Sequence, residues 1–375
     1  MNIPPILYIY EGRMNGVGCD LDVYHHLKGL SEAGILVDFI SRGKVDLPGI
    51  SNFKTVLALA KPFSSCPSPI YSGARRRCLS HLGSRAMRRK GYGLAMAWAQ
   101  SGLPFFETAK KQGIPSMLHY GNLHLDFEGP PKPEALWPRI GGSHVRREIE
   151  IAETIVVPSE FCRSSFLAMG VPGEKVKVSL RGADLSRYGK SGEIWTGFRV
   201  VCLGRVCERK GVEQLLDAWE KADLVGAELW FAGSIEGAVQ PLVDRWKGKN
   251  GIQFLGFCSN PAEVLKDANV SVLLSRNEGL AKTLIESAAT GLPLICTKES
   301  GFPMEDGFEG FVVNRNKPEE TAEALKFLFQ NQDQAARMGR KNRERASEIF
   351  SWEKSRKDFV ALIRAAMSSG RNFPS

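Results

Sequence analysis

The chain has 375 residues, of which 43% are hydrophobic and 24% charged, a composition ordinary for a soluble globular protein with room for two domains. No apolar run approaches the roughly 20 residues that a membrane-spanning helix needs. The eight cysteines show neither a CxxC pair nor the spacing of zinc ligands, and the net charge is +9. Reduced cysteines, and an apolar N-terminal run that no basic region precedes, favour a cytoplasmic protein without a signal peptide.

The first half alternates short apolar runs with helix-like patterns. Residues 6–10 predict a first strand, 21–34 a helix and 35–41 a second strand. Residues 48–90 are rich in Pro, Ser, Gly and Arg, so we expect an irregular or mobile segment there. The pattern then resumes in the strand-like 91–99, the helix-like 104–113, the strand-like 114–120, the Pro/Gly-rich loop 127–138, the helix-like 145–154 and the strand-like 155–159.

A basic cluster lies within the segment expected to be irregular. From Arg75 to Lys90 the chain has seven Lys and Arg residues and no acidic residue. Such a cluster can bind anionic lipid, polyphosphate or nucleic acid, or it can be a solvated surface without a partner. Nucleic acid is disfavoured because few aromatic residues interleave and no helix-turn-helix, zinc-finger or RNP-type motif occurs. An anionic membrane surface or a lipid phosphate is the partner that we expect.

The second half repeats the alternation more regularly. Six apolar runs are typical of buried strands: residues 198–204, 228–233, 252–256, 270–275, 293–297 and 311–313. Helix-like patterns lie between or after them, at residues 211–219, 261–268 and 317–330. Strands that alternate with helices imply βαβ units and a parallel, doubly wound sheet.

These patterns predict an α/β protein with two Rossmann-like, doubly wound domains that face each other across a cleft. The first domain would span residues 1–180 and the second residues 198–350, with the Gly/Ser-rich residues 181–197 as the linker. A last helix, residues 351–367, would pack back on the first domain.

The first candidate ligand-binding segment is NGVG, residues 15–18, directly after the first predicted strand. Its glycines would let backbone N–H groups approach a phosphate at a helix N-terminus, although a simple turn explains them as well. The full GxGxxG fingerprint is absent because position 21 is Leu, and no acidic residue is clearly placed for a ribose, although Asp38 lies within the second strand. A nicotinamide-dependent oxidoreductase is therefore disfavoured.

Two further segments follow buried strands of the second domain. GRVCERKG, residues 204–211, carries Arg205 and Lys210 on a loop that opens a helix, and these cations suit a diphosphate. In NEGLAKTLIES, residues 277–287, Glu278 and Glu286 lie eight positions apart. An ionised carboxylate can accept two hydrogen bonds from vicinal sugar hydroxyls, but the spacing alone fits helix-dipole complementation and a solvated helix residue equally. Backbone amides at the start of this helix would meet the phosphates, namely those of Gly279, Leu280 and Ala281.

GRVCERKG, then FAG (231–233), then NEGLAKTLIESAATGLP (277–293) resemble, in this order, the retaining nucleotide-sugar glycosyltransferases of family four, which have the GT-B fold. Residues 157–188 are similar to the interdomain passage of that family, and FSWEK (350–354) to its C-terminal crossover. The resemblance covers residues 140–365 and, more loosely, residues 1–45. The chain departs from the family pattern at three positions, Arg181, Ala281 and Ser287, where Asn, Gly and Ala are common.

The resemblance implies a role for each matching residue. Glu278 would bind the donor sugar, Glu286 the ribose, and Arg205 and Lys210 the diphosphate, against which Gly16 would pack.

It also implies a first-domain histidine near the donor sugar. His124 fits that place better than His119, although either histidine could be structural. The DLD triplet, residues 20–22, resembles the metal-binding DxD of another glycosyltransferase fold. Because it precedes a helix, we interpret it as a helix N-cap that complements the dipole.

The function that the resemblance implies is transfer of a sugar from a nucleoside-diphosphate donor to an acceptor hydroxyl, with retention at the anomeric carbon, in cell-surface glycan or glycolipid synthesis. Neither a metal nor another cofactor is expected besides the donor substrate. The acceptor could be lipid-linked, and the enzyme peripheral on the cytoplasmic membrane face. The alternative is a nucleotide-sugar-binding protein without transferase activity.

Overall fold

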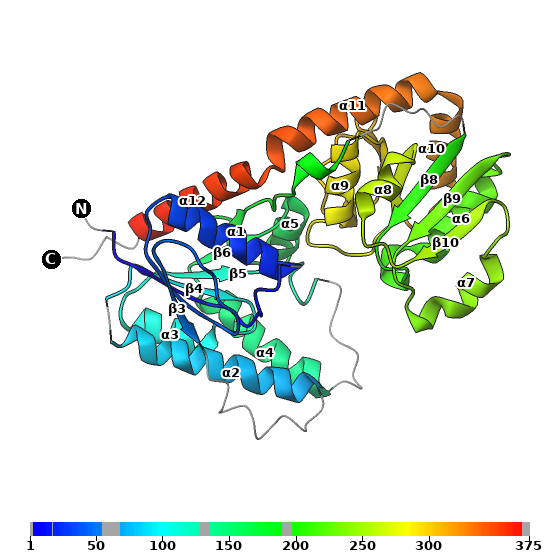
Figure 1. The fold of residues 1–375 in the computed structure, drawn as a ribbon. Helices are drawn as coiled ribbons and strands as arrows, with labels where there is room; N and C mark the ends of the chain where they lie inside the picture. Colours follow the sequence, from blue (N-terminus) through cyan, green and yellow to red (C-terminus); the bar gives the residue numbers. More distant parts are fainter. Residues whose placement is uncertain are drawn as a thin grey trace. The chain divides into compact units, whose positions relative to one another are not determined.

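The computed structural model describes residues 3–16, 18–54, 68–89, 91–127, 136–189 and 197–369. The chain forms two compact units: unit 1 comprises residues 1–179 with 355–375, and unit 2 comprises residues 180–354 (Figure 1). The domain limits and the linker at 181–197 stay predictions, and residues 190–196 of that linker lie outside the described residues.

Unit 1 is built on one parallel sheet with the strand order β3-β2-β1-β4-β5-β6-β7. Its strands are β1 Ile6–Ile9, β2 Val37–Ser41, β3 Ile50–Lys54, β4 Leu94–Trp98, β5 Ser116–His119, β6 Thr154–Val157 and β7 Val176–Val178. Its helices are α1 Cys19–Glu32, α2 Ser68–Met87, α3 Leu103–Lys111, α4 Leu136–Ile151, α5 Glu160–Ala168 and, from residue 355 on, α12 Trp352–Ser369.

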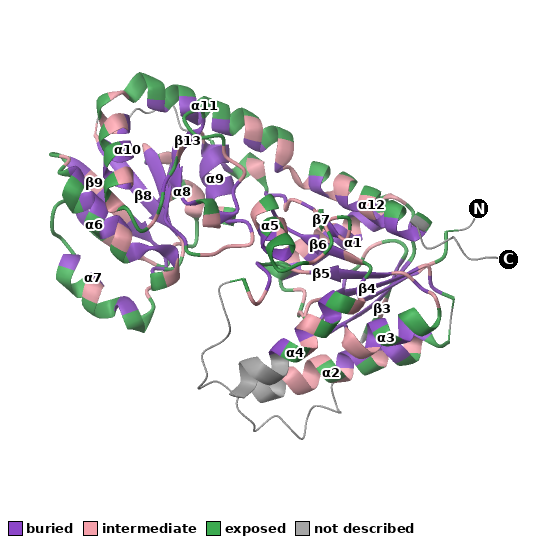
Figure 2. Ribbon diagram, turned by 180° about the vertical axis from the view of Figure 1, so that it is seen from behind, coloured by how far each residue is buried: buried purple, intermediate pink, exposed green. Residues whose placement is uncertain are grey.

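Helices cover both faces of this sheet, because its central strands are apolar on both sides (Figure 1). Leu7 and Ile9 of β1 pack into the cluster that α2, α3, α4 and α5 complete. Ile6 and Tyr8, which point the other way along the same strand, pack with α1 and α12. Figure 2 shows the consequence: the central strands are buried, whereas the helices that cover them combine buried and exposed residues.

The expectation of an irregular segment over residues 48–90 is wrong in two places. Residues 50–54 form β3, the edge strand beside β2, and residues 68–87 form the helix α2; residues 55–67 and 90 lie outside the described residues. Glycine usually disfavours a helix, which is why composition suggested an irregular segment. Here Gly83 lets α2 pack closely against β1 and α3, because a Cβ at this position would lie 3.0 Å from both Ile9 and Phe105. Similarly, residues 136–138 of the expected loop 127–138 begin α4, and residues 128–135 are outside the described residues.

Unit 2 is built on a second parallel sheet with the order β10-β9-β8-β11-β12-β13. Its strands are β8 Phe198–Leu203, β9 Ala227–Ala232, β10 Ile252–Gly256, β11 Val270–Leu273, β12 Leu294–Cys296 and β13 Gly310–Val312. Its helices are α6 Val212–Ala222, α7 Gln240–Trp246, α8 Pro261–Lys266, α9 Lys282–Thr290, α10 Pro318–Gln330 and α11 Gln332–Ile349. The predicted strands and helices are confirmed here to within a residue or two at most ends, whereas α7 and α11 have no counterpart among the predictions.

The order of this sheet is the 3-2-1-4-5-6 order of Rossmann folds, and the first six strands of unit 1 follow it too. In such parallel sheets the order in which strands are added reverses between the first and fourth strands, here between β8 and β11 in unit 2, and ligands bind at the carboxyl ends of these two strands. The predicted α/β class with two doubly wound sheets is confirmed. Among the described residues, we find no helix with the length and apolar character to cross a membrane.

Candidate functional site

The loops that follow β8 and β11 lie against each other at the carboxyl edge of the unit 2 sheet. The N–H of Arg276 donates to the carbonyl of Arg209 (2.8 Å). At Gly211 the backbone has a φ of +74°, and a Cβ there would lie 2.2 Å from the carbonyl oxygen of Leu274. Glycine is therefore required for the close approach that sets Lys210 beside the residues after β11.

Three of the side chains in these loops form one charged cluster. The Lys210 ammonium lies 2.7 Å from Oε1 of Glu278, and Nη1 of Arg209 lies 2.6 Å from the same oxygen. The Lys210 side chain is only 9% exposed and that of Glu278 16%. A buried ammonium is tolerated only when it is paired, so the carboxylate holds Lys210 in place as a cation.

Glu286, the second predicted carboxylate, is buried in α9 with 3% exposure. Its Oε1 accepts hydrogen bonds from the Tyr188 hydroxyl (2.7 Å) and the Lys282 ammonium (3.1 Å). Burial and the hydrogen bond to Glu286 raise the pKa of Tyr188, so its hydroxyl stays a donor. Oε2 of Glu286 has no hydrogen-bond partner among the described residues and can accept from a ligand.

The first turn of α9 meets the Lys210 side chain above Gly204. A Cβ at Gly204 would lie 3.7 Å from both Nζ of Lys210 and Cγ2 of Thr283. The Thr283 hydroxyl is buried without a hydrogen-bond partner in the part of the chain that the structure describes. The ammonium and the positive end of the helix dipole together suit an anionic oxygen.

Two residues predicted to contact the diphosphate already have other partners. The guanidinium of Arg205 is 63% exposed and pairs with Glu236 at 3.3 Å. The Ala281 N–H already donates to the carbonyl of Ser300 (3.0 Å), so a phosphate would have to displace that bond. Lys210, Glu278 and the start of α9 are the parts that the structure brings together, whereas the assigned roles of these residues and of Gly279 and Leu280 stay predictions.

Sequence reasoning missed three residues of this site, Arg209, Tyr188 and Thr283. Arg209 lies within GRVCERKG next to Lys210, so the motif pointed to this segment. Residue type alone did not show which of its basic residues contact Glu278. Tyr188 ends the segment 157–188, 98 positions before Glu286, and only the fold brings the two together.

In unit 1, the loop between β1 and α1 contains the predicted Gly16. Gly16 is exposed with a φ of +77°, and the space where its Cβ would lie is open. Its glycine character is thus needed for the backbone conformation and leaves the peptide approachable. The proposed contact between Gly16 and a diphosphate stays a prediction.

Asp20 holds this loop in place. It accepts hydrogen bonds from the Tyr10 hydroxyl (2.7 Å) and the Asn15 N–H (2.9 Å). The interpretation of DLD as an N-cap is wrong, because the N-cap of α1 is Gly18, and no side chain makes a capping hydrogen bond there. Asp38 is also no ribose ligand, since it is buried in β2 and accepts the Tyr92 hydroxyl at 2.7 Å.

The two candidate histidines have different surroundings. His119 stacks on Trp98 with 4.3 Å between ring centroids and lies 4.6 Å from His26, and burial lowers its pKa to about 3. His124 accepts the Asp126 N–H at Nδ1 (3.2 Å), which assigns its proton to Nε2. Burial lowers the pKa of His124 too, so it stays neutral. His119 therefore has a packing role, and His124 is the one whose Nε2–H can reach a ligand.

The comparison with known protein families finds a match in the part of the chain that carries the charged cluster. Residues 190–345 match the family described as Glycosyl transferases group 1. The matched stretch makes up most of unit 2. This chain is 27% identical over 168 residues to the lipopolysaccharide core biosynthesis glycosyltransferase LpsE of Rhizobium meliloti, a match that covers 44% of this chain and 49% of LpsE. The chain spans about half the length of the curated relatives that it matches.

Solved structures of glycosyltransferases share the fold of this chain over nearly its whole length. Sucrose-phosphate synthase from Thermosynechococcus elongatus aligns with a TM-score of 0.77 at 18% identity and covers 98% of this chain and 100% of that chain. Anabaena HepE in complex with UDP-glucose aligns with a TM-score of 0.70 at 17% identity and covers 96% of this chain and 100% of that chain. The predicted GT-B fold and the predicted family are confirmed.

Proposed function

We propose that this protein transfers a sugar from a nucleoside-diphosphate donor to an acceptor hydroxyl with retention of the anomeric configuration. The observation that carries the proposal is the Lys210–Glu278 pair at the carboxyl ends of β8 and β11, next to the start of α9. An ammonium and a helix N-terminus suit a diphosphate, and the carboxylates of Glu278 and Glu286 suit the hydroxyls of sugar and ribose.

The charges of the site fit the needs of a departing diphosphate. As the bond between the anomeric carbon and the diphosphate breaks, negative charge grows on the phosphate oxygen. Lys210 stabilises that charge, because its ion pair with Glu278 holds it in place before the reaction. The acceptor oxygen forms the new glycosidic bond on the same face of the sugar, and its proton passes to the leaving phosphate oxygen.

The two glutamates divide the rest of the donor between them. Glu278 accepts hydrogen bonds from the sugar hydroxyls while it keeps Lys210 charged. Glu286 uses Oε2 for the ribose hydroxyls, since Tyr188 and Lys282 already contact Oε1. His124, neutral with its proton on Nε2, donates to a sugar hydroxyl, and Gly16 lets the backbone of its loop approach the diphosphate.

Thermal shift with a panel of nucleoside diphosphates and their sugars tests the site. We expect one nucleoside diphosphate to raise the melting temperature of the wild type. Lys210→Ala and Glu286→Ala should each weaken its binding at least tenfold, about 1.4 kcal/mol, and so reduce that rise. Lys326→Ala, which removes an exposed ammonium from α10, is the matched control. If both site variants bind the nucleotide as the wild type does, the proposed site is wrong.

Turnover separates a transferase from a nucleotide-sugar-binding protein. A transferase given donor and acceptor releases the nucleoside diphosphate, whereas a binding protein shows the thermal shift without release. NMR of the product shows the configuration at its anomeric carbon, and an inverted product would contradict the proposed mechanism.

The acceptor is proposed to be lipid-linked at an anionic membrane surface on the cytoplasmic side. Arg75 and Arg76 on α2 both pair with Glu11, but Arg85, Arg88 and Arg89 are exposed at and beyond the end of that helix. Three exposed cations contribute roughly 1 kcal/mol each near anionic lipid. Sedimentation with vesicles of anionic lipid should show binding at low salt that weakens as salt rises and in Arg88→Ala/Arg89→Ala, and absence of binding at low salt removes the idea.

A further inference from the structure

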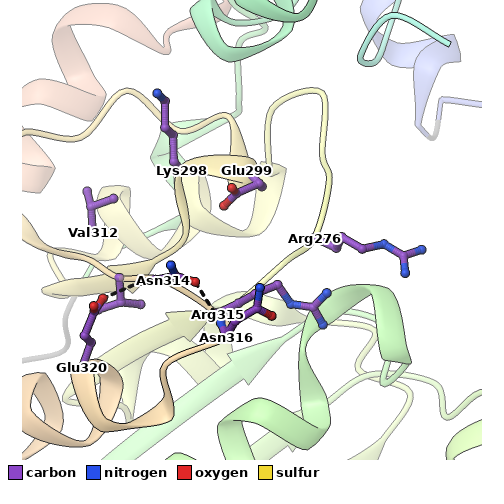
Figure 3. A pocket seen from close by; sticks show the side chains of 9 residues that line it. Arg276, Lys298, Glu299, Val312, Asn314, Arg315, Asn316 and Glu320 are labelled. Carbon is purple, nitrogen blue, oxygen red and sulfur yellow. Dashed lines mark hydrogen bonds between the residues drawn. The ribbon is translucent and has the colours of Figure 1, made fainter. Parts of the chain in front are cut away.

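A second depression lies beside the charged cluster, at the carboxyl ends of β12 and β13 in unit 2. It has a volume of about 660 Å³, within the roughly 300–1,000 Å³ of small-molecule sites. Figure 3 shows its wall: Lys298 and Glu299 come from the turn after β12, and Asn314, Arg315 and Asn316 from the segment after β13. None of the roles proposed above uses this pocket.

The pocket and the proposed donor site share one wall. The Glu278 N–H donates to the carbonyl of Glu299 (2.9 Å), and Arg276, which also lines the pocket, donates its N–H to the carbonyl of Arg209 (2.8 Å). The segment 276–278 thus has the pocket on one side and the charged cluster on the other. A group bound in the pocket lies next to the residues proposed to hold the donor sugar.

Three cations line the pocket, and their side chains differ in how firmly they are held. Arg315 is fixed, since its Nη2 donates to Oε1 of Gln214 (2.8 Å) and to the carbonyl of Glu208 (3.3 Å). The Arg276 guanidinium makes only a 3.4 Å contact with Glu208, and both side chains are more than half exposed. The Lys298 ammonium has no ion-pair or hydrogen-bond partner among the described residues. Two cations are thus available to an anion at modest cost.

The acidic side chains of the pocket do not cancel these cations. Glu320 is already engaged by the Asn314 N–H (2.8 Å) and the Lys317 ammonium (3.1 Å), and the first of these contacts chiefly lowers its pKa. Glu299 adds an acceptor, and the side-chain amides of Asn314 and Asn316 add donors and acceptors. A ring with several hydroxyls matches such groups, because every hydroxyl both donates and accepts.

We propose that this pocket binds an acidic sugar residue, a pyranose that carries a carboxylate or a phosphate, as part of a substrate of the transfer reaction. Lys298 contacts the anionic group, while Asn314, Asn316 and Glu299 contact the hydroxyls. The proposal rests on the proposed glycosyl transfer for the role of this sugar, and on the pocket alone for its binding. The acidic residue belongs either to the acceptor glycan or to the donor sugar.

Binding of simple sugars to the full-length protein tests the recognition. We expect glucuronic acid and glucose 6-phosphate to bind, measured by titration calorimetry or ligand-observed NMR, and glucose to bind at least about tenfold more weakly, since a hydrogen bond to a charged group contributes about that factor. Lys298→Ala should weaken the acidic sugars about tenfold. Lys326→Ala, with the same charge removed from an exposed site outside the pocket, should leave them unchanged. Lys298 is exposed, so melting temperatures should confirm that both variants fold.

Three results would overturn the proposal: unchanged binding in Lys298→Ala, glucose binding as tightly as glucuronic acid, or inorganic phosphate binding as tightly as glucose 6-phosphate. The two sources of the acidic sugar give different supporting results. For an acidic donor, UDP-glucuronic acid binds more tightly than UDP-glucose, and Lys298→Ala removes the difference. For an acidic acceptor, free glucuronic acid still binds when a nucleoside diphosphate saturates the protein.

Failure of this proposal is distinct from failure of the proposed function. Nucleoside-diphosphate binding that is lost in Lys210→Ala but kept in Lys298→Ala supports the donor site, whatever happens at the pocket. Acidic-sugar binding that survives Lys210→Ala but not Lys298→Ala supports the pocket independently of the donor site.

Discussion

Glu278→Gln and Lys210→Met should destabilise unit 2 unequally, although they remove the two halves of one ion pair. With Glu278 neutralised, the nearly buried Lys210 ammonium keeps no carboxylate within ion-pair distance among the described residues. Loss of the partner of a buried charge costs about 3–5 kcal/mol. With Lys210 removed, Glu278 still accepts from Arg209 at 2.6 Å, so only one charge-assisted hydrogen bond is lost, about 1.5–3 kcal/mol.

Differential scanning calorimetry measures this difference. For a unit of this size each 1 kcal/mol shifts the melting temperature by about 2–4 °C, so Glu278→Gln should lower it by about 6–20 °C and Lys210→Met by distinctly less. Lys326→Met, at an exposed position on α10, should stay within about 0.5 kcal/mol of the wild type. The reasoning about Arg209 is refuted if Lys210→Met loses as much stability as Glu278→Gln, or more.

The same two variants should respond oppositely to a ligand. A nucleoside diphosphate at 100 times its dissociation constant stabilises the wild type by about 2.7 kcal/mol. Because the diphosphate is assigned to Lys210, a tenfold loss of affinity in Lys210→Met should remove about half of this stabilisation. It should persist in Glu278→Gln, because the amide oxygen of the new side chain can still accept from the Lys210 ammonium. Loss of the nucleotide response in both variants would show that the two roles cannot be separated.

Three further predictions concern unit 1. His119 has a pKa of about 3 when folded, below its ordinary value near 6.5. Stability should therefore be full above pH 6.5 and fall as the pH drops towards 3, by about 2 kcal/mol at pH 5. Urea denaturation should show that the stability of His119→Phe depends less on pH than that of the wild type, and an equal pH dependence would contradict the assignment. Asp20→Ala should lose about 1–3 kcal/mol with its hydrogen bonds to Tyr10 and Asn15; Tyr10→Phe should add little to that loss, whereas fully additive losses would exclude the coupling. Gly83→Val should cost about 1–3 kcal/mol by overpacking against Ile9 and Phe105; Gly91→Ala, where a Cβ meets open space, is the control, and a stable Gly83→Val would contradict the packing of α2.

Local sequence was enough to predict the sheet of unit 2 and the strands β1, β2, β4, β5 and β6 of unit 1, but not β3 or β7. Runs such as FRVVCL are apolar on both sides of the strand, which is the pattern of a strand buried between two layers of helices. The helix at Lys282–Thr290 was predictable for a similar reason, since it is rich in good helix formers and ends at Gly291 in the left-handed region. Because ligands meet parallel sheets at the carboxyl ends of strands, positions after β8 and β11 also indicated Lys210 and Glu278.

Long-range packing decided the features that sequence reasoning missed or misjudged. The segment 68–87 is a helix although it is rich in Gly, Ser and Arg, because Gly83 admits β1 and α3 at close range and Arg75 pairs with Glu11, 64 positions away. Asp20 lies where an N-cap was expected, yet its carboxylate turns to Tyr10, ten positions earlier, because the loop between them folds back.

The sequence by itself determined the strands of unit 2 and most strands of unit 1, and it indicated the carboxyl edge of the unit 2 sheet as the candidate ligand site. Only the tertiary structure decided which residues contact each other at that edge. Arg209 and Lys210 both pair with Glu278, and Tyr188 donates a hydrogen bond to Glu286, 98 positions further along the chain. The pocket at the ends of β12 and β13 also depends on the fold. The physical reason is the range of the interactions involved. Periodicity and helix propensity act over a few neighbouring residues, whereas an ion pair or a pocket depends on loop conformations and strand order that the whole fold fixes.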